Sequence, residues 1–405
     1  MKVLQVNVVY GKGSTGKITE DIHNDLLKNN FDSVVCYGRG ARSDDPKVIK
    51  TCGESYSKVN NLFSRINGIM YGGCVFSTQR LIREIKKQSP DIVHLQCING
   101  YFVNIYRLVK WLKINHIKTV LTLHAEFMFT GGCGLAIDCN QWHSRQGCGL
   151  AICPRWRSET KSLFFDRTGT MWNRMKNAFD GFDDNLVVVS VSPWLMDRAK
   201  ASPIFKDKRH CVVMNGLNDS VFYPRIADTL HGKYALGDKK IVFHASPAFT
   251  DQNGDLKGGF HLIEIAKLLP EFVFVVAGPY HLSSEVPDNV ILLGMIKDQN
   301  ELASYYSEAD VTLLVSQKET FSMVTAESLC CGTPVVGFKA GGPESIAIPA
   351  YSEFVEYGNY EQVIAAVKKH IETKVDPIVC KNKYAMRVMT EKYVRIYNEL
   401  HVGAI

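Results

Sequence analysis

The chain has 405 residues, of which 46% are apolar and 22% charged, and its formal net charge is +6. This length suits two domains with sizeable cores, and the composition is that of an ordinary globular protein. The modest basic excess fits anionic substrates or an anionic membrane surface, but the absence of a long Lys/Arg run argues against a nucleic-acid partner.

The amino terminus, Met1–Tyr10, is apolar but is interrupted by Gln5 and Asn7, and no small-residue cleavage site follows. It predicts a buried first strand and not a secretory signal. No stretch reaches the roughly 18 apolar residues that spanning a membrane requires. We therefore expect a cytoplasmic protein, in which the twelve cysteines are mostly reduced thiols.

Short apolar runs alternate with amphipathic stretches along the whole chain. The predicted strands are Val3–Val9, Ser33–Tyr37, Ile92–Gln96, Thr119–Leu123, Leu186–Val191, Cys211–Met214, Lys240–His244, Phe272–Ala277, Val290–Leu293, Val311–Val315 and Pro334–Phe338. Helical patterns are Thr19–Asn29, Phe102–Lys113, Phe260–Leu269 and Gln299–Ala309, with one or two helices at Pro377–Leu400. This α/β alternation predicts parallel sheets covered on both faces.

Eleven predicted strands are many for one sheet, so we expect two successive Rossmann-like units. The boundary is placed near residues 195–210, where a turn-rich segment follows Ser192-Pro193-Trp194. The first domain is then 1–200 and the second 201–379. Ligands of open parallel sheets bind beyond the carboxyl ends of the strands, so the expected site is a cleft between the two sheets.

The segment Gly11-Lys-Gly-Ser-Thr-Gly-Lys17 follows the first strand and matches the start of a phosphate-binding P-loop. Ile18 stands where magnesium binding needs Ser or Thr, so a triphosphatase site is not expected. Two readings stay open. The backbone around Gly13, Gly16 and Lys17 is approached by an acceptor or a diphosphate, or the turn serves packing alone.

His124 comes directly after the strand Thr119–Leu123. A histidine beyond the carboxyl end of a strand can donate to a sugar hydroxyl or to a developing charge, or it can be a satisfied structural group.

Four cysteines, Cys133, Cys139, Cys148 and Cys153, fall within one short stretch. Their spacing is looser than the paired cysteines of ordinary zinc modules. A structural zinc, unligated thiols and a disulfide all stay open. Four protein ligands would leave no open coordination position, so any metal here would be structural.

Two carboxylates, Glu319 and Glu327, bracket a Thr/Ser-bearing segment directly after the apolar run Val311–Val315. A strand that leads into such a helix start presents free backbone N–H groups, which suit a phosphate, while the carboxylates suit the hydroxyls of sugar rings. Lys257 opens a second helix start, where a cation is poorly placed unless an anion is bound. Together these features indicate a nucleotide-sugar site.

The sequence lacks the motifs of several other enzyme classes. No two aspartates are two residues apart, so a D-x-D site for a divalent ion on a diphosphate is missing. No G-x-S-x-G, H-E-x-x-H or kinase signature is present.

The ordered set of motifs resembles glycosyltransferase family 4. The matching residues are Asn215-Gly216 before Phe222-Tyr-Pro224, Lys257-Gly258, Glu319 and Glu327 in E-x7-E, Gly332-Thr-Pro-Val-Val-Gly337 and Gly341-Gly-Pro-Glu344. The amino-terminal half, with Asn99-Gly-Tyr-Phe102, His124 and Thr130-Gly-Gly-Cys133, is similar to the branch of O-antigen and colanic acid transferases in bacterial surface-polysaccharide synthesis.

The resemblance implies a GT-B fold of two facing Rossmann-like domains with a deep cleft, in which the final helix, 380–405, returns to the first domain. It implies a metal-independent, retaining transferase with a UDP- or GDP-sugar donor. The implied catalytic residues are Glu319 and His124. The implied donor-binding residues are Gly16, Lys17, Asn215, Lys257, Phe321, Ser322, Met323, Val324 and Glu327, and the acceptor-side residues are Gly13, Asn99 and Tyr101.

The family usually has a basic residue about ten positions before the Lys-Gly pair, whereas this chain has Phe243–Phe249 without an Arg. His244 or Lys17 is the expected substitute. The implied acceptor is a lipid-linked oligosaccharide in O-antigen, capsule or other lipopolysaccharide and exopolysaccharide synthesis, with peripheral contact to the cytoplasmic face of the inner membrane. A nucleotide-sugar epimerase on the same fold and a non-catalytic nucleotide-sugar binding module are the alternatives.

Overall fold

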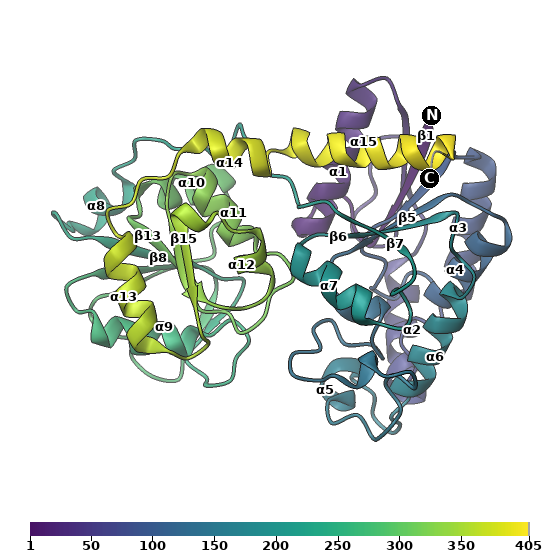
Figure 1. Ribbon diagram of the computed structural model, residues 1–405, viewed down its shortest axis with the longest axis horizontal. Coiled ribbons are helices and arrows are strands. Elements are labelled where there is room, and N and C mark those ends of the chain that lie inside the picture. Colours follow the sequence, from purple (N-terminus) through teal and green to yellow (C-terminus); the bar gives the residue numbers. More distant parts are fainter. Residues whose placement is uncertain (404–405) are drawn as a thin grey trace. The chain divides into compact units, whose positions relative to one another are not determined.

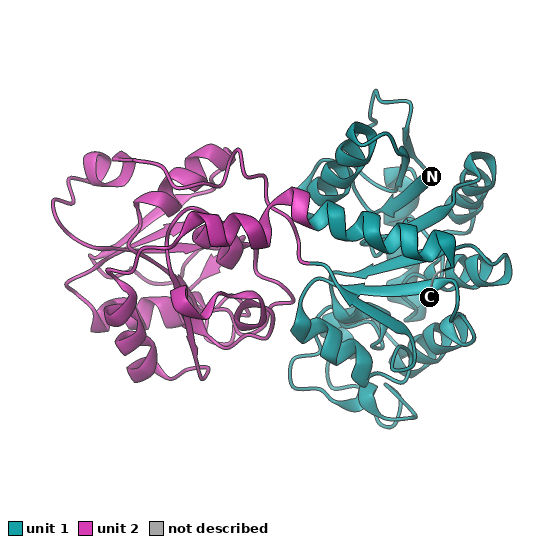
Figure 2. Cartoon of the chain, turned by 45° about the horizontal axis from the view of Figure 1, so that its top comes forward, with its two compact units in different colours: residues 1–213, 389–405 teal, residues 214–388 magenta. Residues whose placement is uncertain are grey.

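The computed structural model describes residues 1–403, which form two compact units (Figures 1 and 2). Unit 1 comprises Met1–Val213 together with the chain from Met389 onward, and unit 2 comprises Met214–Val388. Each unit is a parallel sheet flanked by helices. Among the described residues, no helix combines the length and apolarity that crossing a bilayer requires.

Unit 1 contains a seven-stranded sheet in the order β3-β2-β1-β4-β5-β6-β7, in which all neighbours are parallel. Its strands are β1 (Lys2–Asn7), β2 (Asp32–Tyr37), β3 (Val48–Lys50), β4 (Ile92–Leu95), β5 (Thr119–Leu123), β6 (Leu186–Ser190) and β7 (Arg209–Val212). The strand order reverses between β1 and β4, so the loops that follow these two strands meet at the carboxyl edge of the sheet.

The helices of unit 1 connect these strands and cover the sheet. They are α1 (Gly13–Lys28), α2 (Glu54–Asn67), α3 (Val75–Gln88), α4 (Ile105–Ile114), η1 (Glu126–Met128), η2 (Gln141–His143), α5 (Trp156–Thr160), α6 (Thr168–Phe179), α7 (Pro193–Ala201) and, from Met389 onward, α15 (Met386–Val402). Helix α7 and strand β7 extend unit 1 beyond residue 200, because β7 adds a seventh strand to its sheet.

Helix α15 is fastened to the sheet of unit 1 through buried polar groups. The Tyr397 hydroxyl lies 2.7 Å from His94 Nδ1, and His94 Nε2 lies 2.8 Å from Thr122 Oγ1. Tyr393 adds a hydroxyl contact of 3.0 Å to Thr122. Burial lowers the pKa of His94 to about 3, so its imidazole is neutral at neutral pH.

Unit 2 contains a six-stranded sheet in the order β12-β10-β8-β13-β14-β15, again wholly parallel, and a short ribbon of β9 and β11. Its strands are β8 (Ile241–Ala245), β9 (Phe249–Thr250), β10 (Val273–Ala277), β11 (Tyr280–His281), β12 (Val290–Gly294), β13 (Val311–Leu314), β14 (Val335–Phe338) and β15 (Ser352–Val355). The order reverses between β8 and β13, which is the switch point of this sheet.

The helices of unit 2 pack on this sheet around a core of apolar strand and helix residues, among them Val242, Leu262, Phe274, Leu313 and Val336. The helices are α8 (Thr229–Tyr234), α9 (Gly259–Leu268), α10 (Gln299–Glu308), α11 (Met323–Cys330), α12 (Gly342–Ile346), η3 (Pro349–Tyr351), α13 (Tyr360–His370) and α14 (Pro377–Tyr384).

Each predicted strand overlaps an observed one. The prediction missed β3, β9, β11 and β15, which are short and carry polar residues, so their apolar signal is weak. The predicted start of the first helix at Thr19 is wrong, because α1 begins at Gly13 and includes Gly16 and Lys17. The pattern at Pro377–Leu400 resolves into two helices, α14 and α15.

Gly258 allows a close approach that no other residue type permits. It has φ +72°, and a Cβ there would lie 2.1 Å from the Val315 carbonyl oxygen. We expect Gly258→Ala to lower the free energy of unfolding by about 3 kcal/mol, from left-handed strain and overpacking together. Gly254→Ala is the matched control, because Gly254 has φ +89° but no atom within 4 Å of the added Cβ. Equal destabilisation of the two variants in urea titrations would contradict this account.

The neutral state of His94 makes the stability of unit 1 depend on pH. In the unfolded chain this histidine takes up a proton below its ordinary pKa of 6.5, whereas in the folded chain it does so only near pH 3. The unfolded state therefore binds more protons in this window, and stability falls as the pH drops through it. We expect His94→Gln to be less stable than wild type at pH 7, but its free energy of unfolding should depend less steeply on pH, by up to about 1.4 kcal/mol per pH unit. Urea titrations between pH 7 and 4 measure both slopes, and equal slopes would rule out this role for His94.

Candidate functional site

The candidate site of unit 2 lies at the switch point of its sheet, beyond the carboxyl ends of β8 and β13. Lys257 precedes α9 and Glu319 follows β13, so two segments far apart in sequence contribute to it. Gln317 N donates to the Leu256 carbonyl oxygen at 2.9 Å, which holds the two segments together. Lys257 Nζ lies 2.8 Å from Glu319 Oε1.

The Glu319 carboxylate is held from several sides. Ser316 Oγ donates to Glu319 Oε1 at 2.8 Å, on the oxygen that Lys257 contacts. The side chain of Glu319 is 12% exposed and that of Lys257 is 33% exposed, so the pair reaches the surface without being fully solvated. Ser316 is a partner of Glu319 that the sequence analysis missed, and its position one residue after an apolar run was the available signal.

The backbone around Glu319 is fixed by the loop before α12. Glu319 N donates to the Ala340 carbonyl oxygen at 2.9 Å, and Gly342 N donates to the Glu319 carbonyl oxygen at 2.9 Å. A Cβ on Gly342 would lie 2.5 Å from Phe321 N, so this approach also needs glycine. The carboxylate of Glu344 accepts from the N–H groups of Ala340 and Gly341 and fixes the loop in turn.

Helix α11 begins beside this pair with a strained residue. Ser322 has φ +84°, which is unusual for a residue with a side chain. Its hydroxyl accepts from Thr325 N at 3.2 Å and so caps the helix. The side chain is thereby occupied by the cap, while the first N–H groups of a helix, here at Met323 and Val324, have no acceptor within the helix. Such a start favours an anion.

A cavity of about 380 Å³ opens beside the start of α11. It is lined by Val324 of α11, Leu302 of α10 and residues that end or follow strands β8, β10 and β12, namely Ala245, Ser246, Pro247, Ala277, Gly278, Pro279, Met295 and Ile296. The lining is mostly apolar, which suits a flat ring with few polar groups. Of these residues, Val324 was expected as a donor-binding residue, and backbone contacts around Gly278 and Ile296 were expected to distinguish UDP from GDP.

The second carboxylate, Glu327, lies one turn into α11 and accepts from the Tyr306 hydroxyl at 3.2 Å. Burial, with the Glu327 charge beside it, holds the pKa of Tyr306 well above its usual value. Tyr306 is a second partner that sequence reasoning missed. Asn215 is buried near the start of unit 2, and Phe321 is buried immediately before the α11 cap.

His244, expected as one substitute for a missing arginine, is not a cation here. Its Nδ1 lies 2.9 Å from the Leu313 carbonyl oxygen, so this nitrogen carries the proton. Burial lowers the pKa of His244 to about 4. The expectation fails because a neutral imidazole adds no positive charge, and Lys257 is the cation of this site. Lys17, the other expected substitute, belongs to unit 1.

The predicted residues of unit 1 gather at the switch point of their own sheet. The thiol of Cys97 donates to Asn99 Oδ1 at 2.6 Å and also contacts Thr15, so the loop after β4 meets the start of α1. Gly13 is open to its surroundings, whereas a Cβ on Gly16 would lie 3.0 Å from a Val9 methyl group. This close contact gives Gly16 a packing role between α1 and the segment after β1.

Two further predicted residues flank this region. Lys17 is exposed. The ring of Tyr101 lies 5.2 Å from that of Tyr71, and its backbone is left-handed with φ +58°.

His124 lies beyond the end of β5 and contacts its neighbours through buried amides. Its Nε2 lies 3.0 Å from Gln96 Oε1, and Gln96 Nε2 donates to Gln5 Oε1 at 3.3 Å. Because the Gln96 oxygen accepts, Nε2 of His124 carries the proton. Burial lowers the pKa of His124 to about 4, so the imidazole is neutral at pH 7.

The neighbouring acid, Glu126, is fully buried and takes no part in this arrangement. It pairs with Arg198 and accepts from the N–H of Ala136.

The four cysteines, for which zinc, unligated thiols and a disulfide were all open, lie in one region. Besides burial, the charges of Cys148 and Cys153 raise the pKa of Cys133, and the charge of Cys139 raises the pKa of Cys148 and Cys153. All four are free thiols, and Cys133, Cys148 and Cys153 are buried. Within residues 1–403, the one group of three or more side chains whose ligand atoms lie within 4.8 Å of one another is Asp228, His231 and Glu308. No three of the four sulfurs lie within 4.8 Å of one another, and the zinc alternative stays a prediction.

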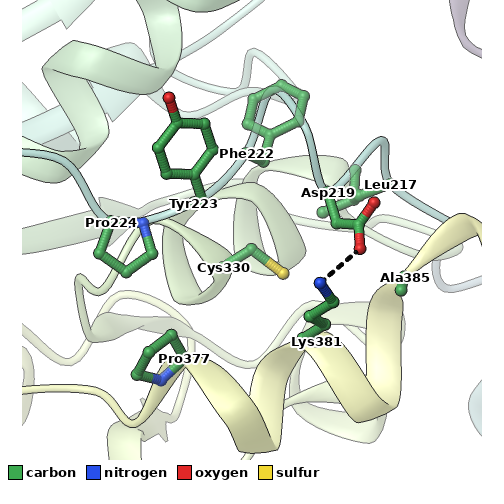
Figure 3. A pocket seen from close by; sticks show the side chains of 9 residues that line it. All are labelled: Leu217, Asp219, Phe222, Tyr223, Pro224, Cys330, Pro377, Lys381 and Ala385. Carbon is green, nitrogen blue, oxygen red and sulfur yellow. Dashed lines mark ion pairs between the residues drawn. The ribbon is translucent and has the colours of Figure 1, made fainter.

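The group of Asp228, His231 and Glu308 already has a structural explanation. The Glu308 carboxylate accepts from the N–H groups of Thr229, Leu230 and His231 and contacts His231 Nδ1 at 2.9 Å. It therefore anchors the start of α8. A second cavity of unit 2, of about 80 Å³, lies between α14 and the segment 217–224, and the ion pair of Asp219 and Lys381 (3.0 Å) borders it (Figure 3).

Comparison with known proteins agrees with this geometry. Residues 231–386, most of unit 2, match the family of group 1 glycosyl transferases. The chain is 30% identical over 177 residues to N-acetyl-alpha-D-glucosaminyl L-malate synthase of Bacillus anthracis, in a match that covers 41% of this chain and 45% of that protein.

Two solved structures resemble the chain over nearly its whole length. A glycosyltransferase from Rickettsia africae has a TM-score of 0.66 and 17% identity and covers 98% of both chains. Anabaena HepE in complex with UDP has a TM-score of 0.65 and 14% identity, covering 98% of this chain and 100% of that one. Similarity at this level of identity shows the shared GT-B fold. The match over unit 2 adds to this shared fold a sequence similarity to the group 1 glycosyl transferases.

Proposed function

We propose that this protein is a retaining glycosyltransferase that moves a sugar from a nucleotide-diphosphate sugar to a saccharide acceptor. The observation that carries the proposal is the pair of Lys257 and Glu319 beside the capped start of α11 and the apolar cavity. The cation and the row of amide donors suit the diphosphate of such a donor, the carboxylate suits its sugar, and the apolar cavity suits its nucleoside.

The donor is arranged as follows. The nucleoside lies in the cavity lined by Ser246 and Gly278, with the ribose toward Glu327 and Asn215. The diphosphate lies against Lys257 and the amides of residues 321–324, and the sugar lies toward Glu319. Either UDP or GDP is the carrier, and the complex of HepE with UDP supports the first.

The reaction develops negative charge on the departing diphosphate. Lys257 and the start of α11 stabilise this charge, which is usually the largest catalytic contribution. The acceptor oxygen bonds to the anomeric carbon on the face from which the diphosphate leaves, so configuration is retained. A diphosphate oxygen takes the proton of the acceptor hydroxyl. The chain supplies the positive charge through Lys257 and backbone N–H groups, and the proposal needs no metal.

The acceptor is a lipid-linked oligosaccharide of bacterial surface-polysaccharide synthesis, with peripheral contact to the inner membrane. In unit 1 we assign it to the region of Gly13, Asn99 and Tyr101, and we propose Gly16, Lys17 and His124 as further donor-binding and catalytic residues, as the family resemblance implies. The resemblance of the first half to O-antigen and colanic acid transferases supports this choice.

Replacing Glu319 tests the reaction directly. We expect Glu319→Ala to reduce sugar transfer at least about a hundredfold, since it removes a carboxylate beside the reacting sugar. The melting temperature should change little, because this ion pair is partly exposed. Product analysis with donor alone and with donor plus acceptor separates transfer from epimerisation. Glu356→Ala is the control, since it removes a carboxylate from another lysine pair in unit 2; transfer near the wild-type level by Glu319→Ala would contradict the proposal.

Replacing Lys257 tests the diphosphate contact separately. We expect Lys257→Met to weaken binding of the nucleoside diphosphate by about tenfold or more, because a charge-assisted hydrogen bond is lost. Binding of the bare nucleoside should stay within twofold or so, since the cavity is unchanged. Calorimetric titration measures both affinities. Lys267→Met, which loses an exposed ion pair with Glu264, is the control, and an equal loss for nucleoside and diphosphate would argue against a phosphate contact.

A further inference from the structure

Helix α2 of unit 1 has its amphipathic faces reversed. Its fully buried side chains are Ser57 and Ser64, while its large apolar residues face outward. Val59, Leu62, Phe63 and Ile66 are 49%, 57%, 61% and 42% exposed. Their spacing of i, i+3, i+4 and i+7 places them on one side of the helix, and we call them the α2 stripe. A helix that only covered a core would bury these residues.

The apolar surface continues beyond both ends of α2. At one end the N–H of Phe76 donates to the Tyr56 hydroxyl at 3.2 Å, and the Phe76 side chain is 78% exposed. At the other end Leu163 N donates to the Arg65 carbonyl oxygen at 2.8 Å, which places the exposed residues Leu163, Phe164 and Phe165 beside the helix. We call the α2 stripe with Phe76 and residues 163–165 the α2 surface. Exposed apolar residues gathered on and beside one helix in this way indicate an interaction site.

Positive charge surrounds the α2 surface. Lys58, Arg65, Lys161 and Arg167 are exposed. None of the four takes part in an ion pair within the part of the chain that the structure describes. The acids of the same segments are engaged: Glu54 with Arg39 and Lys50, Glu159 with Arg155, and Asp166 with the N–H groups of Cys153 and Thr168.

A basic groove adjoins the chain that follows α2. It has a volume of about 450 Å³ and is lined by Arg107, Lys110, Trp111 and Arg174 among others. The Tyr106 hydroxyl, also in the lining, donates to the Met70 carbonyl oxygen at 3.0 Å and so ties the groove to the segment after α2. The cations therefore extend from the α2 surface onto α4 and α6.

We propose that the α2 surface is the face by which this protein docks on an anionic phospholipid bilayer. An outward apolar stripe flanked by Lys and Arg is the pattern of a helix that lies in the plane of a membrane interface, with the apolar side chains among the acyl chains and the cations at the headgroups. The inference rests on the peripheral membrane contact of the proposed function and names the surface that makes it.

Charge favours a bilayer over a second copy of the chain. Two α2 surfaces facing each other would bring like charges together, since each carries four cations without an acidic partner, and such juxtaposition opposes association. An anionic headgroup layer can pair with all four cations at once. The acyl chains beneath it accept apolar side chains without requiring a complementary shape. Self-association and an acidic protein partner are the alternatives. A concentration-dependent dimer would indicate the first, and absence of vesicle binding is the outcome expected for the second.

Co-sedimentation with vesicles tests the apolar part. Vesicles of phosphatidylcholine with about 30 mol% phosphatidylglycerol should bind the wild-type chain, and pure phosphatidylcholine should bind it much less. We expect Leu62→Gln with Phe63→Gln to weaken the binding at least about tenfold. The matched control is Ile226→Gln with Ile378→Gln, which removes two exposed residues of unit 2, and it should bind as wild type does. Absence of wild-type binding, or equal losses in both double variants, would overturn the proposal.

The charges are tested in the same assay. Lys58→Gln with Arg65→Gln should abolish most of the preference for anionic vesicles, whereas Lys28→Gln with Lys374→Gln, which changes the net charge equally, should retain it. Light scattering of the wild type over a range of concentrations measures self-association. A dimer that is lost in the Leu62/Phe63 variant would show that a second copy of the chain, and not a bilayer, covers the α2 surface.

Donor-nucleotide affinity separates this inference from the transferase reaction. The Leu62/Phe63 variant should bind the donor nucleotide with wild-type affinity. A loss of vesicle binding in this variant would then not reflect damage to the donor site. Failure of the Glu319→Ala prediction would in turn leave the vesicle result standing.

Discussion

The close backbone approach at the switch point of unit 2 determines the rest of its site. Gly258 lies against the Val315 carbonyl, and Gly342 lies against Phe321 N, with no room for a Cβ at either position. Between these two contacts the chain after β13 has little freedom, and Glu319 and the start of α11 are held where β8 and β13 diverge. The side chains of the site are therefore positioned by glycines that have no polar group to offer a ligand.

Part of this site could be predicted from the sequence, and part of it could not. Lys257 and Glu319 are 62 residues apart, yet strand order alone brings them together, because both follow central strands of a parallel sheet. The partners Ser316 and Tyr306 escaped prediction, since a serine after a strand and a tyrosine in a helix have many ordinary roles. The neutral state of His244 was also out of reach, because it depends on burial and on a carbonyl of the neighbouring strand.

In unit 1 the sequence predicts local elements but not how they pack. The apolar spacing of α2 indicates a helix with one apolar face, but periodicity does not reveal whether that face points inward or outward. Only packing decides this, and here Ser57 and Ser64 are turned inward. The cysteine cluster is similar. Sequence proximity left a metal site open, and the thiols share one region, but no three of their sulfurs lie within 4.8 Å of one another. Local spacing predicts elements well, but it does not give the direction in which a helix face points or the distances within a cluster.

The contact between Lys257 and Glu319 also has a consequence for how the proposed reaction would proceed. Without donor the two charges neutralise each other, and the lysine is not left as a lone cation near the surface. A bound diphosphate offers Lys257 a stronger anionic partner, since it carries more charge and more acceptor oxygens than one carboxylate. Glu319 would then lose its cation and turn toward the hydroxyls of the donor sugar, with Ser316 still donating to it. One ion pair thus links diphosphate binding to release of the carboxylate that the sugar requires, so the catalytic arrangement would be completed by the donor itself.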